Sequence, residues 1–383
     1  MKKMLILLFL TVILALSGLI SDHSTIAAAA IPKNTVYMDK SNHSYIPLRV
    51  LTGFGGIQTQ WNAATKGINI SLADITVTLT VGQATAYVNG KPVTISERAF
   101  SENGTTYVPL SLISQSLGIE LTWNTDTSSI TLTQGEVNTT LPVLSGSLLT
   151  ADSPAVVSAN RTFKIGSRSF NVQTVTISLL HPKISLDVVL AGNSVGKVEA
   201  LGSLAKRSSA IAAINSTFFD AYTQGNYKAP YGYIVSGGKI LMKSSGDRRT
   251  IFTIDNNNLA ELIPGLDFSN RFAAGSIKGG LQAGPRLLVN GKVALNVAAE
   301  GFKDAKILTG GGARSALGLT RDHKLILLTS GGATIPQLAA IMKQAGAYQA
   351  MNLDGGASSG LYYNGKYMTA PGRLISNAIV IKE

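Results

Sequence analysis

The chain of 383 residues contains no cysteine and only 4 histidines. Without Cys there is no disulfide, no thiolate metal site and no cysteine nucleophile, and so few His leave no room for a multi-histidine metal centre. Charged residues make up only 14% of the chain while hydrophobic residues reach 45%, which excludes a disordered protein. The 33 Lys and Arg exceed the 21 Asp and Glu, giving a formal net charge of +12. The length predicts two or three domains.

The N-terminal segment has the pattern of a secretory signal. Lys2 and Lys3 precede an apolar run from Met4 to Ile20, and the alanines at 27–30 offer an A-x-A-like cleavage site. We therefore expect residues 1–30 to be a signal peptide, with an uncleaved anchor as the alternative. A secreted or cell-wall associated protein, peripheral to the cell envelope, follows from this. Its excess of cations suits an anionic wall polymer, although a solvated basic surface explains it equally well.

A repeat marks the first folded region. YIPLRVLTGFGGIQTQWN begins at Tyr45 and YVPLSLISQSLGIELTWN begins at Tyr107, so Trp61 and Trp123 correspond. Each unit places Pro before a short apolar helix, Gly after it, and two strands around an Asn-containing turn. We expect two duplicated β/α units over residues 35–134, in which each Trp caps a small core. This region resembles the stalk-type domain named after the copper amine oxidase N-terminal domain, and the name implies no copper here.

A Ser/Thr/Gly-rich passage over residues 135–154 is typical of a linker. Beyond it, residues 155–383 alternate strands with few helices, which predicts a larger α+β domain built on a sheet. A helix is expected over Ile335–Ala345, with Thr334 as its N-cap and Gly346 beyond its end. The following strand, Gln349–Leu353, ends at Asp354.

Asp354-Gly355-Gly356-Ala357-Ser358-Ser359 is the most informative stretch. A carboxylate at a strand end, two glycines that admit close backbone approach and two hydroxyls suit an anionic or sugar ligand. A tight turn capped by Asp is the simpler explanation of the same pattern. Asp354 and Asp220 are the candidate catalytic carboxylates. The candidate ligand-binding residues are Asn215, Thr217, Arg314, Ser358, Ser359, Arg373 and Asn377.

Several other polar residues are expected on the surface. Any single Arg is more often part of a surface ion pair than of a site, and Arg248 and Arg249 are interpreted in that way. His181 and His323 have no partner nearby in sequence, so we expect both in surface turns.

The combination of stretches is far more specific than any one of them. The chain resembles the phosphodiester glycosidase family from about residue 170 to 383. The resemblance is carried by AINSTFFD at 213–220, YGYIVSGGKI at 231–240, AGPRLLVNGKV at 283–293, ARSALGLTRDHKLILLTSGG at 313–332, NLDGGASSGLYYNGK at 352–366 and PGRLISNAIVI at 371–381. Ser216 departs from the family, which usually has Gly there.

The resemblance implies a hydrolase that cleaves the glycosidic bond of a sugar-1-phosphodiester. Asp354 would act as base or nucleophile, Asp220 as the second carboxylate, and Arg314 and Arg373 would hold the phosphate. The expected partner is a phosphorylated glycan or cell-wall polymer, with no nucleic acid, no cofactor and no catalytic metal. A structural Ca²⁺ held by backbone carbonyls would leave no sequence signature. A non-catalytic glycan-binding protein and a metal-dependent phosphodiesterase that cuts the P–O bond are the alternatives.

Overall fold

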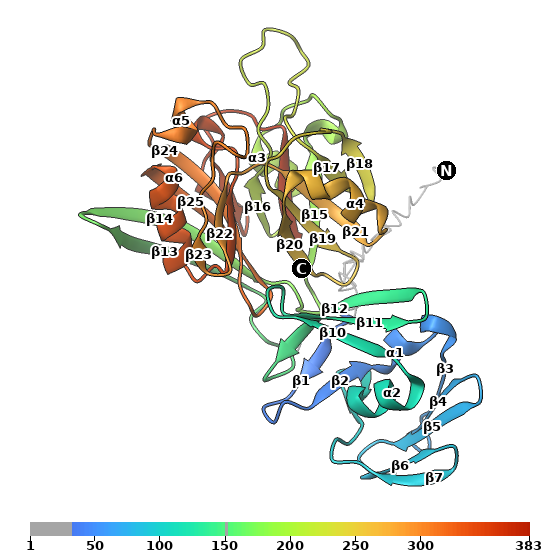
Figure 1. Ribbon diagram of the computed structural model, residues 1–383. Coiled ribbons are helices and arrows are strands. Elements are labelled where there is room, and N and C mark those ends of the chain that lie inside the picture. The colour runs from blue at the N-terminus through green and yellow to red at the C-terminus, as the bar shows by residue number, and fades with distance from the viewer. Residues whose placement is uncertain (1–32, 150–151) are drawn as a thin grey trace, which may run out of the picture.

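The computed structural model describes residues 33–149 and 152–383. The expected signal peptide, residues 1–30, lies outside these ranges. Figure 1 shows a smaller N-terminal region, blue to green, below a larger C-terminal region, green to red. Strands dominate both regions and helices are short, so the α+β class holds with a strong bias to β. Within the described ranges no helix is long and apolar enough to cross a membrane.

Over residues 33–149 the N-terminal region contains two sheets, and within this range every strand pair except β1 with β12 is antiparallel. One sheet has the spatial order β10 (Glu120–Asn124), β11 (Ser129–Gln134), β12 (Val137–Ser145), β1 (Val36–Met38), β2 (Ser44–Pro47), β9 (Thr105–Pro109) and β8 (Phe100–Glu102). The other has the order β3 (Gln58–Asn62), β4 (Gly67–Leu72), β5 (Ile75–Thr80), β6 (Thr85–Val88) and β7 (Lys91–Thr94). Helices α1 (Leu48–Leu51) and α2 (Leu110–Leu117) supply part of one shared hydrophobic core.

The repeated sequence units fold alike. Helix α1 leads into hairpin β3–β4, and α2 leads into hairpin β10–β11. In both turns an Asn side chain accepts two backbone N–H bonds, from residues two and three further on: Asn62 in the first and Asn124 in the second. Origin by duplication stays a prediction. Each Trp was expected to cap a small core. Instead, Trp61 and Trp123 are 43% and 47% exposed, so neither side chain is buried against the core.

The C-terminal region consists of three sheets. A seven-stranded sheet has the order β13 (Val156–Ile165), β14 (Arg168–Ser178), β25 (Lys324–Ala333), β24 (Gly312–Leu319), β26 (Gln349–Asn352), β22 (Arg286–Val289) and β23 (Lys292–Val293). A second has the order β15 (Ser185–Leu190), β29 (Asn377–Lys382), β16 (Ala212–Asn215), β27 (Leu361–Tyr363) and β28 (Lys366–Thr369). The third has the order β18 (Lys239–Met242), β17 (Ile234–Ser236), β21 (Ile277–Gln282), β19 (Ile251–Asp255) and β20 (Ala260–Ile263).

All three sheets turn one face to a common core. Val175 of β14, Phe252 of β19 and Ile379 of β29 belong to one buried cluster. The remaining faces carry helices: α6 (Ile335–Gln344) on the seven-stranded sheet, α3 (Leu201–Arg207) on the second, and α4 (Phe268–Ala273) on the third. Apolar side chains are buried from water on both faces of these sheets, and this packing holds the ends of the strands in place.

Local signals in the sequence set the ends of several elements. Helix α6 begins with the expected Thr334 N-cap, which forms a capping box with Gln337. Asn-Gly pairs at 89–90, 290–291 and 364–365 form the tight turns of three hairpins, each with positive φ at both residues.

Part of the expected linker is a strand. Residues 137–145 form β12, which pairs with β11 on one side and β1 on the other. Its sequence is rich in Thr and Val, and these β-branched residues fit a pleated sheet even when Ser and Gly surround them. The N-terminal region therefore extends further than the repeat suggested.

Both histidines that were expected in surface turns are buried instead, His181 at 0% and His323 at 6% exposure. The His323 ring lies within hydrogen-bond distance of the carbonyl oxygens of Ser128 (3.0 Å) and Val143 (3.2 Å), which belong to the N-terminal region. Asn257 adds a bond from its amide to the carbonyl of Thr140, at 3.0 Å. These contacts dock the two regions together, and their partners are far apart in sequence.

Candidate active site

A pocket of about 550 Å³ opens where strand ends of two sheets meet. Its wall includes the start of β24, the loop after β26, the segment after β16 and helix α5 (Ala305–Leu308). Asp220, Asp354, Arg314 and Arg373 all line it, so the structure brings together the four charged residues that the sequence singled out. Their chemical roles remain predictions.

Asp354 lies at the base of this pocket, directly beyond β26. Its backbone N–H donates to the carbonyl of Ser216, at 2.8 Å, which fixes the loop against the end of β16. Burial raises the pKa of Asp354 to about 7, while a side-chain bond from Ser358 and the charge of Arg373 oppose the rise. The carboxyl group therefore exchanges a proton near neutral pH, as a catalytic acid or base must.

The two glycines after Asp354 serve different purposes. A Cβ on Gly355 would lie 2.9 Å from the carbonyl oxygen of Ala313, so this position is closed by the neighbouring strand and not by a ligand. Gly356 has φ of +61° and open space around its Cβ position, and it lines the pocket. Only Gly356 thus leaves room for a ligand, in a conformation that L side chains rarely adopt.

Asn215 lies beneath the pocket and ties three segments together. Its amide nitrogen donates to the carbonyl of Asp354, at 2.6 Å. Its amide oxygen accepts from the Ser315 hydroxyl (2.7 Å) and from the Gly360 N–H (3.0 Å). Both ends of the amide are engaged, so Asn215 positions the Asp354 loop instead of orienting a sugar, the role expected from the sequence.

The remaining polar candidates are also buried under the pocket. Asn377 accepts the Thr217 N–H at 3.0 Å, and the hydroxyl of Ser216 accepts the Ile379 N–H at 2.9 Å. Exposures of Thr217, Ser358, Ser359 and Asn377 are 1–4%, and none of these residues lines the pocket. Of the four, Ser358 has a side-chain hydrogen bond to the candidate catalytic carboxyl group of Asp354. Ser216 is used inside the fold, so its departure from glycine does not block a ligand.

Asp220 approaches the pocket from the segment after β16. Its carboxylate accepts the N–H of Thr223 at 3.0 Å, and its own N–H donates to the carbonyl of Ala229 at 2.8 Å. Burial and the Asp220 charge together raise the pKa of Tyr231, another pocket residue. Asp220 is thus a fixed second carboxylate beside an aromatic wall.

Arg373 covers one side of the pocket and is held there by Tyr222. Its guanidinium donates to the Tyr222 hydroxyl at 2.9 Å and lies 4.9 Å from the centre of the ring. The hydrogen bond and the charge of Arg373 lower the pKa of Tyr222. A cation on an aromatic ring keeps its remaining donors available to an anion.

Arg314 plays a different part from the phosphate-binding role that was expected. It is only 3% exposed. Its Nε donates to the carbonyl of Ala333 at 2.9 Å, and its Nη2 donates to the carbonyls of Lys306 (2.7 Å) and Gly310 (2.9 Å). Three backbone carbonyls thus accept hydrogen bonds from the Arg314 guanidinium. Arg314 therefore holds in place the wall that carries Lys306, a second cation of the pocket.

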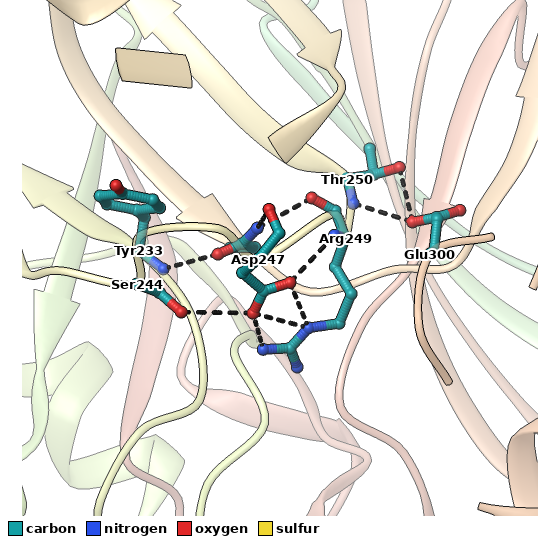
Figure 2. A network of polar contacts seen from close by, with 7 residues as sticks. Tyr233, Ser244, Asp247, Arg249, Thr250 and Glu300 are labelled. Carbon is teal, nitrogen blue, oxygen red and sulfur yellow. Dashed lines mark hydrogen bonds and ion pairs between the residues drawn. The ribbon is translucent and has the colours of Figure 1, made fainter. Parts of the chain in front are cut away.

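Arg249 was assigned to the surface and instead lines the pocket. Figure 2 shows its guanidinium paired with Asp247, within a network that fixes the loop. Gln282 donates to the carbonyls of Asp247 (3.2 Å) and Arg249 (2.9 Å), and the next residue, Thr250, donates twice to Glu300. No local signal in the sequence predicts this placement, because Gln282 and Glu300 are remote in the chain.

Aromatic side chains form the rest of the wall. Phe218 and Phe302 pack edge to face at 5.9 Å, and the Arg249 guanidinium lies about 6 Å from both rings (5.8 and 6.0 Å). Tyr222 and Tyr231 are 73% and 47% exposed at the pocket. None of the four was expected as a site residue, although Phe218 and Tyr231 lie in the stretches AINSTFFD and YGYIVSGGKI that resemble the family. Flat rings suit the apolar faces of sugars.

The pocket combines three carboxylates (Asp220, Asp304 and Asp354), cations that include Lys306 and Arg373, and aromatic walls. This set suits an anionic carbohydrate. Within residues 33–149 and 152–383, no three His, Asp or Glu side chains are grouped to hold a metal ion. The family comparisons point to the same kind of site. Residues 208–382 match the phosphodiester glycosidase family, and residues 29–132 match the copper amine oxidase N-terminal domain. Both family resemblances seen in the sequence are thereby confirmed.

Solved structures share the fold. The zebrafish N-acetylglucosamine-1-phosphodiester alpha-N-acetylglucosaminidase catalytic domain, described as auto-inhibited by its pro-peptide, aligns with a TM-score of 0.52 and 21% identity, over 61% of this chain and 85% of its own. A hypothetical protein from Synechocystis aligns with a TM-score of 0.50 and 15% identity, over 92% of this chain and 99% of its own. A comparison with curated protein sequences gives no match.

Proposed function

We propose that the C-terminal domain hydrolyses a sugar-1-phosphodiester, breaking the bond between the anomeric carbon and the phosphate oxygen. The family of residues 208–382 supports a hydrolase of this type. The observation that carries the proposal is the convergence of Asp354, Asp220, Arg373 and Lys306 on one pocket. The signal-like segment at 1–30 and the formal net charge of +12 favour export. Together with the pocket, they support an enzyme that acts on a cell-surface or extracellular phosphorylated glycan.

The chemistry suits a carboxyl group with a pKa of about 7. Cleavage at an anomeric carbon passes through an oxocarbenium-like state, which a neighbouring carboxylate stabilises or attacks. A phosphodiester leaves as a weak base, so it needs little protonation. Asp354 in its ionised form then serves as base or nucleophile, and Asp220 is the second carboxylate that the reaction can use.

The departing phosphate needs cations rather than an acid. Arg373 is free to donate beyond its bond to Tyr222, and Lys306 extends from α5 on the same pocket. Positive groups placed where negative charge accumulates stabilise the transition state more than the ground state. Arg314 contributes by holding the Lys306 backbone, and the aromatic walls hold the sugar.

Product analysis tests the proposal. The purified protein is incubated with a panel of sugar-1-phosphodiesters, and the products are separated by mass. We expect free reducing sugar and a phosphomonoester of the aglycone. In H₂¹⁸O the phosphomonoester should stay unlabelled, because water attacks the anomeric carbon, whereas label in the phosphomonoester would show cleavage of the P–O bond. Phosphate retained on the sugar would show cleavage of the P–O bond, and binding without turnover of any panel member would support a glycan-binding protein; either result contradicts the proposal.

Replacing Arg373 with Ala should lower kcat/KM by about 10- to 100-fold, because a charge-assisted bond to the departing phosphate is lost. R373K should recover part of the rate, since it keeps the charge without the fork. R321A is the matched control: Arg321 stacks on Tyr348 at 5.1 Å, away from the pocket. Steady-state kinetics on one diester make the comparison, and equal rates for R373A and R321A would remove Arg373 from phosphate binding.

A further inference from the structure

A long hairpin extends from the edge of the seven-stranded sheet. Strands β13 and β14 pair along their whole length, from Val156 with Ile177 to Ile165 with Arg168. Only the inner half of β14 pairs onward with β25, as far as Val172 with Ser330. The tip of the hairpin therefore stands free of the sheet, as Figure 1 shows on the left.

The hairpin carries positive charge without compensation. The sequence from Ser153 to Leu186 contains no Asp or Glu. Arg161, Lys164 and Arg168 near the tip are all exposed, and none of the three forms an ion pair in the described part of the chain. Cations on an edge strand discourage pairing with other chains, but three of them without any acid also create a local positive field.

The hairpin tip adjoins the wall of the candidate pocket. Arg168 donates to the carbonyl of Gly332, at 3.4 Å. The next residue, Ala333, accepts the Nε of Arg314, and Arg314 lines the pocket. On the other side, the Gln344 amide donates to the carbonyl of Lys164 at 3.2 Å, next to the exposed Lys343. In the register of β13 with β14, Arg161 and Arg168 lie on one face of the hairpin and Lys164 lies on the other. Arg161 therefore shares the face on which Arg168 contacts Gly332, beside the pocket wall.

We infer that Arg161 and Arg168 bind neighbouring phosphodiester groups of a polymeric substrate, one linkage of which occupies the pocket. This inference rests on the proposed function and names its substrate class: a chain of sugar units joined through phosphodiesters, not a small diester. A pocket of about 550 Å³ holds one linkage. Further anionic linkages of a polymer must lie outside it, and the hairpin offers the adjacent cations.

The test compares a polymer with a monomer. R161Q/R168Q removes both charges. R168Q gives up a 3.4 Å bond to the carbonyl of Gly332 and a contact with the Phe170 ring, so melting temperatures are compared first to confirm the fold. For wild type and variant, kcat/KM is measured on a phosphodiester-linked glycan oligomer and on the monomeric sugar-1-phosphodiester, at low and at high salt. We expect a loss of roughly five- to tenfold on the oligomer at low salt, shrinking at high salt, and no change on the monomer.

The matched control is K66Q/K91Q, which removes two exposed cations of the N-terminal region. Equal losses in the two variants would assign the effect to net charge and overturn the inference. Equilibrium binding of the phosphodiester-linked glycan oligomer, measured in a D354N background, provides a readout without catalysis. If R161Q/R168Q binds this oligomer as tightly as the protein with both arginines, the hairpin has no such role, whether or not the protein hydrolyses diesters. Inactivity on every diester together with weakened oligomer binding would instead refute only the proposed reaction.

Discussion

The D354N variant is expected to lose about 10²- to 10⁴-fold in kcat/KM on a sugar-1-phosphodiester, the range that acid–base groups contribute. The amide keeps the size of the side chain but cannot accept a proton or attack the anomeric carbon. Wild-type kcat/KM should rise with pH until about pH 7 and then level off, because the ionised carboxylate is the active form and its pKa is about 7. A rate that falls above pH 7 would make Asp354 a general acid.

Stability separates this loss from unfolding. The pKa of Asp354 in the folded protein lies above its ordinary value, so ionisation costs stability as pH rises from about 4 to about 7. An uncharged Asn avoids that cost, so D354N should melt at or above the wild-type temperature at pH 8. A lower Tm together with lost activity would indicate a structural role.

Asp255 provides a matched control for Asp354. It is a buried carboxyl group whose pKa burial raises to about 6, and it accepts the N–H groups of Asn257 and Leu259 outside the pocket. D255N should change stability but leave kcat/KM near the wild-type value. Similar kinetic losses in both variants would show that the kinetics report folding and not the chemistry of Asp354.

R314M is expected to lose both stability and activity. The apolar side chain leaves the carbonyls of Ala333, Lys306 and Gly310 without their donor. Buried acceptors without partners cost about 1–3 kcal/mol each, and partial relaxation limits the total to about 3 kcal/mol. For a domain of this size, that lowers Tm by about 6–12 °C. Activity should fall because the wall carrying Lys306 shifts.

R314K distinguishes the two roles considered for Arg314. A phosphate-binding cation would be replaced in part by Lys, with stability preserved, whereas a positioning residue needs the fork and would lose stability again. Thermal melting and kinetics are measured on the same samples. R248M is the control, because Arg248 is exposed and its replacement should change stability by less than about 0.5 kcal/mol.

The local rules of the sequence located much of the site. An apolar strand followed by Asp354, glycines and hydroxyls predicted a loop at a strand end, and β26 delivers Asp354 there. Capping at Thr334 and the Asn-Gly turns were equally local, since each depends on residues within a few positions. Convergence of four charged residues from remote segments followed from the family resemblance, because no periodicity reports a distance between loops.

Predictions about single side chains failed where distant partners decide. His323 is buried because its ring lies within hydrogen-bond distance of the carbonyl oxygens of Ser128 and Val143. Arg249 lines the pocket because hydrogen bonds with Gln282 and Glu300 fix its loop. Charged residues flank both positions, Asp322 and Lys324 beside His323 and Asp247 and Arg248 before Arg249, which is typical of a surface. Arg314 was rightly placed at the pocket, but its partners there are backbone carbonyls.

By itself the sequence determined many of the strands and tight turns and that two family domains follow one another, because these depend on neighbouring residues and on a pattern of motifs. Only the tertiary structure decided which polar groups face the pocket and which hold it from below. It also decided that Asp354 titrates near pH 7, since the pKa of a carboxyl group depends on how completely the packed chain removes it from water.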